Sequence, residues 1–195
     1  KLREKTQGQL IIKEYPTAAA HSGHFKALMN ELALKKSFRP DVIFIDYLNI
    51  CASSRFKGGN ISSYFYVKAI AEELRGLAVE FNVPIFSATQ TTRTGFVSTD
   101  IGLEDTAESF GLPATADFMF ALVSNEELEQ LGQMKVKQLK NRYNDPSINR
   151  AFIIGVDRSK MRLFDVQQQH QQIVDANQKD NKEDAYDKFS DFKVW

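Results

Sequence analysis

The chain of 195 residues has few cysteines and no long hydrophobic run. Cys51 is its single cysteine, which excludes a disulfide bond within the chain and is typical of proteins from a reducing compartment. No apolar run approaches the roughly 20 residues of a membrane-spanning helix, and no signal-peptide pattern is present. We therefore expect a cytoplasmic protein without a membrane partner.

Net charge is absent as well, because 25 Lys and Arg balance 25 Asp and Glu. A neutral chain has no global field that would attract nucleic acid, although local basic loops remain compatible with this balance. Apolar residues make up 43% of the sequence and there are 15 Phe, which argues for a packed globular body. The length is sufficient for one domain with a sizeable core, followed by a tail.

Hydrophobic periodicity predicts strands that alternate with helices. Strands are predicted at residues 9–16, 42–46, 83–90, 116–122, 134–140, 151–157 and 161–166. Helices are predicted at 21–38, between residue 60 and the strand at 83, and at 125–132. In the second helix, Ile70, Leu74 and Leu77 share an apolar side, and Glu73 is assigned to the opposite, charged side. This order predicts an α/β fold with a mostly parallel sheet and C-terminal antiparallel hairpins.

Two stretches lack such a pattern. Residues 91–115 are irregular, and an irregular segment of this length inside a compact domain is usually functional or mobile. Residues 167–195 are rich in Gln, Asp, Asn and Lys, with six acidic residues against four lysines. We therefore predict a folded body at 1–166 and a polar, acidic, flexible tail at 167–195.

Two polar residues follow predicted parallel strands. Asp46 comes directly after "VIFI", and Gln90 comes after "IFSAT". Ligands of parallel α/β sheets bind at the carboxyl ends of the strands, and a carboxylate there suits Mg²⁺ in phosphoryl transfer. Gln90 could orient a water molecule or contact a phosphate. Taken alone, Asp46 could be a strand-terminal residue that caps a turn, and Gln90 could be an ordinary hydrogen-bonded side chain.

Four segments in order resemble the DnaB-like replicative helicases, most closely those of large tailed phages. They are "DVIFIDYL" (41–48), "FNVPIFSATQTTR" (81–93), "ESFGLPATADFMFAL" (108–122) and "VKQLKNRYND" (136–145), and the resemblance runs from about residue 9 to residue 166. It implies a RecA-like P-loop ATPase core that uses ATP and Mg²⁺. It also implies a hexameric ring that translocates on single-stranded DNA and unwinds duplex at the replication fork.

The resemblance implies a role for each matching residue. Asp46 corresponds to the magnesium carboxylate of the Walker B strand, and Gln90 to the residue that couples the γ-phosphate to DNA-facing loops. Lys140 and Arg142, in "KNR", resemble the pair that such helicases insert into the ATP site of the neighbouring subunit. A fixed guanidinium supplied there neutralises charge on the transferred phosphoryl group. Without the other motifs, this pair would be interpreted as a solvated basic turn.

The loop at 91–115 is expected to line the central channel and to contact single-stranded DNA. The candidate DNA-binding residues are Arg93, Glu108, Ser109 and Gly111. The sequence departs from the family at Ala107, the position before the Glu, which is often Arg in bacterial members. Primase, a helicase loader and a single-strand-binding protein are the further partners that the resemblance implies.

The sequence contains no G-x-x-x-x-G-K-[ST] motif, which is the phosphate-binding loop of such ATPases. The chain also begins with Lys1 rather than Met. We therefore expect the C-terminal portion of a helicase motor, which does not hydrolyse ATP by itself. Two alternatives remain: a recombinase-type RecA-like ATPase, and a non-catalytic module that binds DNA or a partner and lacks a nucleotide site.

Overall fold

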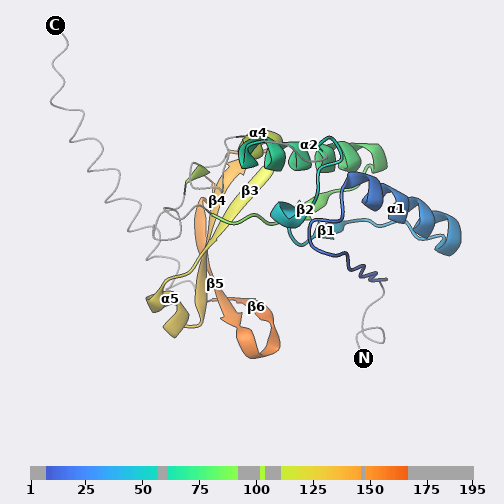
Figure 1. Cartoon of the computed structure of the whole chain (residues 1–195). Coiled ribbons are helices and arrows are strands. Elements are labelled where there is room, and N and C mark those ends of the chain that lie inside the picture. Colours follow the sequence, from blue (N-terminus) through green and yellow to red (C-terminus); the bar gives the residue numbers. More distant parts are fainter. Residues whose placement is uncertain (1–7, 57–60, 92–101, 104–110, 146–147, 167–195) are drawn as a thin grey trace, which may run out of the picture. The chain divides into compact units, whose positions relative to one another are not determined.

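The computed structural model describes residues 8–56, 61–91, 102–103, 111–145 and 148–166. The chain divides into two compact units, Lys1–Gln90 and Thr91–Trp195. Figure 1 shows helices beside a short sheet in the first unit, and long paired strands in the second. Within the described part of the chain, no helix is long and apolar enough to span a membrane.

The first unit packs two helices against a small parallel sheet. Its elements are α1 (Ser22–Lys36), β1 (Ile43–Ile45), the 3-10 helix η1 (Leu48–Ile50), α2 (Ser63–Phe81) and β2 (Ile85–Ser87). Met29, Leu77 and Val83 form a buried cluster, against which Phe25, Ile43, Phe81 and Ile85 pack. Because this cluster draws on both helices and both strands, it holds the sheet against them.

Local hydrogen bonds explain where α1 begins and ends. The ring of His21 accepts a hydrogen bond from the backbone of Gly23, and the ring of His24 accepts one from the backbone of His21. These two bonds satisfy backbone donors that the first helical turn leaves unpaired. The helix ends where Ser37 adopts a left-handed conformation, with φ of 48°.

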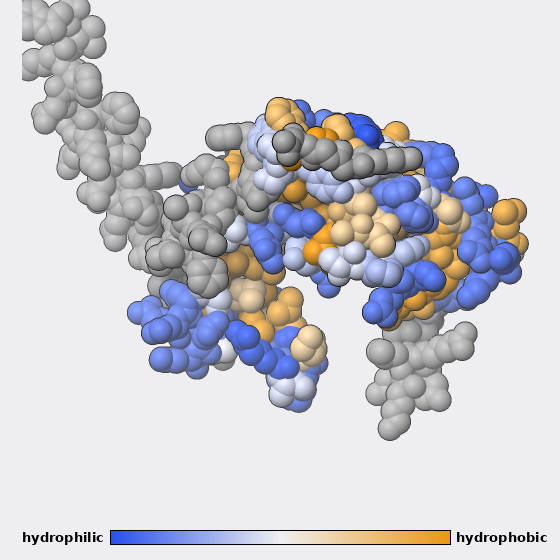
Figure 2. All heavy atoms as spheres, in the orientation of Figure 1, coloured by the Kyte–Doolittle hydropathy of each residue, from blue (hydrophilic) through white to orange (hydrophobic). Residues whose placement is uncertain are grey.

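Strands β1 and β2 are parallel, with Ile43 opposite Ile85 and Ile45 opposite Ser87. The residues between them, Phe44 and Phe86, point to the other face of the sheet, where their rings stack with centroids 5.3 Å apart. Phe44 is 73% exposed, although parallel sheets are normally covered on both faces. Figure 2 shows hydrophobic residues at the surface of both units, interspersed with hydrophilic ones.

The second unit is built on a four-stranded antiparallel sheet in the order β3-β4-β5-β6. Its elements are α4 (Gly111–Thr115), β3 (Phe118–Val123), α5 (Glu126–Gln130), β4 (Gln133–Asn141), β5 (Ala151–Asp157), η3 (Arg158–Lys160) and β6 (Arg162–Asp165). Ala121 and Val123 are buried on one face, where Leu139 packs against them. A Cβ at Gly155 would lie 2.4 Å from the ring of Phe164, so a larger residue there would displace that ring.

The predicted α/β class is confirmed, and most predicted elements are present within a few residues of their expected bounds. The strand predicted at 9–16 is wrong, because these residues have no regular secondary structure. Leu10 and Ile12 are 79% and 84% exposed, and neither is paired with a strand. Alternating apolar residues form a strand only when a partner strand supplies the hydrogen bonds.

Candidate functional site

The carboxyl ends of β1 and β2 are tied together just where Asp46 leaves the sheet. The hydroxyl of Ser87 donates to the carbonyl of Ile45 at 2.8 Å, and the backbone N–H of Leu48 donates to the carbonyl of Ala88 at 3.0 Å. These bonds extend the pairing beyond the last residues of the two strands. They therefore fix the course of the chain on both sides of Asp46.

Side chains continue this connection beyond the strand ends. Thr89 donates its hydroxyl hydrogen to the side-chain oxygen of Asn49 at 2.8 Å. The amide of Gln90 donates to the hydroxyl of Tyr47 at 3.3 Å. The structure thus confirms that Asp46 and Gln90 follow adjacent parallel strands. Sequence reasoning missed the Thr89–Asn49 contact, because neither residue signals its partner 40 positions away.

The carboxylate of Asp46 is exposed, and no hydrogen bond or ion pair in the described part of the chain involves it. Nor do the described residues contain a group of three or more His, Cys, Asp or Glu that could hold a metal ion. A single carboxylate at a strand end fits Mg²⁺, which keeps several waters and uses one or two carboxylates together with phosphate oxygens. The donor set therefore fits magnesium bound to a nucleotide.

A buried carboxylate holds the loop that follows η1. Glu73 on α2 accepts hydrogen bonds from the hydroxyls of Ser53 at 2.6 Å and Ser22 at 2.7 Å, and from the backbone N–H of Ser54 at 2.9 Å. Burial alone would raise the pKa of Glu73, but these hydrogen bonds outweigh it and lower the pKa from 4.5 to about 2. The assignment of Glu73 to a charged surface was wrong, since it is only 9% exposed.

Replacing Glu73 by glutamine should destabilise the chain by about 2 kcal/mol at neutral pH, because it removes a buried, charge-assisted set of hydrogen bonds. The carboxylate of the unmodified chain stabilises the fold above its ordinary pKa of 4.5, and this contribution is lost as the pH falls toward about 2. Denaturant unfolding measures the free energy of unfolding of the unmodified chain and of Glu73→Gln. The difference between these two free energies should therefore shrink as the pH falls from 4.5 toward about 2.

The matched control is Glu72→Gln, which removes the more exposed ion pair with Arg55. It should change the free energy of unfolding by less than about 1 kcal/mol. An equal effect of the two substitutions at neutral pH would show that the Glu73 network does not stabilise the loop.

In the second unit, Lys140 and Arg142 lie at the end of β4. The ammonium of Lys140 donates to the backbone carbonyl of Pro113 at 2.5 Å. Nη1 of Arg142 lies 2.7 Å from Oδ1 of Asp117, and the backbone N–H of Arg142 donates to the carbonyl of Asp117 at 2.9 Å. Both predicted cations are thus held by the segment from Pro113 to Asp117, which precedes β3.

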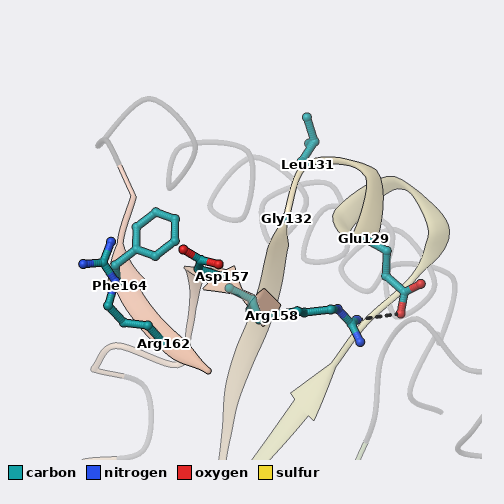
Figure 3. Close-up of a pocket in the computed structure, with 8 residues that line it drawn as sticks. Glu129, Leu131, Gly132, Asp157, Arg158, Arg162 and Phe164 are labelled. Atoms are coloured by element: carbon teal, nitrogen blue, oxygen red, sulfur yellow. Dashed lines mark hydrogen bonds and ion pairs between the residues drawn. The ribbon is translucent and has the colours of Figure 1, made fainter. Parts of the chain in front are cut away.

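An open cavity of about 470 Å³ lies in the second unit, among α5, β5 and β6. Figure 3 shows the Arg158 guanidinium in contact with the Glu129 carboxylate, and the two groups, which both line the cavity, are 3.2 Å apart. Arg162 lies over the ring of Phe164, 5.6 Å from its centroid. None of the predicted site residues lines this cavity, and Asp157, another of its charged residues, pairs with Lys160.

The sequence comparison decides the family. Over 169 residues, 86% of this chain, the sequence is 46% identical to the "DnaB-like replicative helicase" of Enterobacteria phage T4. The chain belongs to the DnaB-like replicative helicases. It spans 36% of the length of that T4 phage relative. No family model matches the chain.

Solved structures agree with this assignment at the level of the fold. The chain is similar to "ATPase Domain of G40P", with a TM-score of 0.64 and 18% identity, over 76% of this chain and 52% of that one. It is equally similar to the helicase in "The Structure Of A DnaB-Like Replicative Helicase And Its Interactions With Primase", with a TM-score of 0.64 and 17% identity. That match covers 76% of this chain and 36% of the other. The fold is therefore that of a RecA-like helicase ATPase domain.

For this member of the DnaB-like family, the predicted DNA contacts remain predictions. Arg93, Glu108 and Ser109 lie outside the described residues. Gly111 begins α4 and is buried. The predicted tail at 167–195 also lies outside the described residues.

Proposed function

We propose that this chain forms part of the motor of a hexameric, ATP-dependent helicase that moves along single-stranded DNA and unwinds duplex at the replication fork. The observation that carries the proposal is the junction of β1 and β2, where Asp46, which is exposed and has no hydrogen bond or ion pair to the described residues, follows one strand and Gln90 follows the next. Family membership supplies the class of reaction.

Each residue of the proposed site has one task. Asp46 holds Mg²⁺, which neutralises charge on the phosphates of bound ATP. Gln90 donates a hydrogen bond to Tyr47 and couples the presence of the γ-phosphate to the DNA-binding loop. Lys140 and Arg142 stabilise the transferred phosphoryl group from the neighbouring subunit, so that hydrolysis depends on the geometry of the ring.

Further polypeptide of the motor completes the site. A phosphate-binding loop is needed, and the exposed stack of Phe44 and Phe86 offers an apolar sheet face that such polypeptide can cover. A structural neighbour of this chain is described with its interactions with primase, and we extend that partner to the complete helicase. A loader and a single-strand-binding protein complete the proposed set of partners.

A hybrid helicase tests this proposal. In the hybrid, this chain replaces the matched region of the T4 phage relative. We expect the hybrid to hydrolyse ATP with stimulation by single-stranded DNA and to unwind a forked duplex, whereas the chain alone does neither. A hybrid that forms rings on DNA without hydrolysing ATP would contradict the proposal and favour a non-catalytic binding module.

A further inference from the structure

The end of the β3–β4 ladder brings an acidic residue against the candidate trans-acting arginine. Phe118 pairs with Asn141 in the antiparallel register, so Asp117 and Arg142 are the next residues opposite one another. The backbone bond from Arg142 to the Asp117 carbonyl, 2.9 Å long, continues the ladder by one step. Strand pairing therefore brings the two side chains together.

The Asp117 carboxylate contacts one corner of the guanidinium. Its Oδ1 atom is shielded from solvent and lies 2.7 Å from Nη1 of Arg142, in an ion pair that does not have hydrogen-bond geometry. A guanidinium carries five N–H donors in one rigid plane, so an ion pair at one nitrogen restrains where the group lies while other N–H groups remain available to a phosphoryl oxygen. The Arg142 side chain is 44% exposed, which leaves it accessible to such a ligand.

Lys140 is held by the same segment. It is two residues before Arg142, on the same face of the strand, and its ammonium donates to the carbonyl of Pro113. The segment from Pro113 to Asp117 thus contacts both cations, one through a backbone oxygen and one through a carboxylate. The two side chains are 44% and 33% exposed, so solvent weakens what this half-buried pair adds to stability, and we assign its main effect to the position of the guanidinium.

We propose that Asp117 is a positioning residue, which orients the Arg142 guanidinium toward the phosphoryl group of ATP bound at the neighbouring subunit. This proposal rests on the proposed function of Arg142. Neutralising Asp117 leaves the charge of Arg142 in place but frees its side chain to adopt other rotamers. The chemical step then slows, because the guanidinium is less often aligned with the phosphoryl group, while ATP binding changes little.

Asp117→Asn in the hybrid helicase should lower kcat by about 10- to 100-fold and leave the KM for ATP within about twofold. The matched control is Glu129→Gln, which neutralises the acidic partner of Arg158 in the same unit and should leave kcat unchanged. In an Arg142→Ala background, adding Asp117→Asn should cause no further loss. An equal further loss in that background would overturn the proposal, since Asp117 would then act independently of Arg142.

The outcomes separate this proposal from the proposed function. If Arg142→Ala leaves turnover intact, the function assigned to Arg142 is wrong. If Arg142→Ala lowers kcat as expected and Asp117→Asn retains the original kcat, only the positioning role is overturned. Arginine side-chain NMR of the 195-residue chain gives a second readout. Rotation of the Arg142 guanidinium should be slow in the unmodified chain and fast in Asp117→Asn, and identical rotation in both would overturn the proposal.

Discussion

Replacing Arg142 by alanine in the hybrid helicase is expected to lower kcat for ATP by about 10³-fold or more, the usual effect of removing an arginine that contacts the transferred phosphoryl group. The KM for ATP should change much less, because the guanidinium acts on charge that develops in the transition state. Steady-state hydrolysis with saturating single-stranded DNA measures both constants. This loss in kcat exceeds the loss expected for Asp117→Asn, because that variant retains the positive charge of Arg142.

Arg158→Ala is the matched control for this loss. Arg158 belongs to the same unit and is also paired with a carboxylate, that of Glu129, but it lies in η3 rather than at the end of β4. Its replacement should leave kcat within about twofold, since exposed ion pairs contribute little to stability. Equal losses in the two variants would indicate a general structural effect and would contradict a specific role for Arg142.

Asp46→Asn should lower kcat in the hybrid by about 10²-fold or more, because an amide cannot replace the charge of a magnesium carboxylate. The concentration of Mg²⁺ required for half-maximal hydrolysis should rise in the same variant. Its thermal stability should match that of the unmodified protein, since Asp46 is exposed and makes no described hydrogen bond or ion pair.

Asp41→Asn provides the comparison, because Asp41 is also exposed and precedes β1, at the opposite end of the strand from Asp46. It should retain full activity. If Asp46→Asn hydrolyses ATP at the original rate and with the original Mg²⁺ dependence, the carboxylate of Asp46 does not bind the magnesium ion and the residue only ends the strand.

The part of the site formed by β1 and β2 could be predicted from the sequence. Asp46 and Gln90 each follow a short apolar run, and parallel strands in one sheet bring such positions to the same edge. The contacts that fix this edge were not predictable. The bond between Thr89 and Asn49 depends on the course of the chain after each strand, for which periodicity carries no signal.

Two other features could not be predicted from sequence patterns, because they too depend on distant parts of the chain. Glu73 has the spacing of a surface residue, and only the serines contributed by the loop after η1 and by α1 make its burial favourable. The contact of Asp117 with Arg142 depends on the exact register of β3 and β4, which shifts between Met119 and Phe120. A one-residue change in that register would separate the two side chains.

Mixed rings test most directly whether Asp46 and Arg142 complete one ATP site from two subunits. The Asp46→Asn and Arg142→Ala hybrids are each expected to hydrolyse ATP at least about 10²-fold more slowly than the unmodified hybrid. When they are mixed and reassembled, some interfaces combine an intact Asp46 from one subunit with an intact Arg142 from its neighbour. DNA-stimulated ATP hydrolysis should therefore recover in the mixture. Absence of recovery at every mixing ratio, with mixed rings verified by mass spectrometry, would contradict a site shared between subunits.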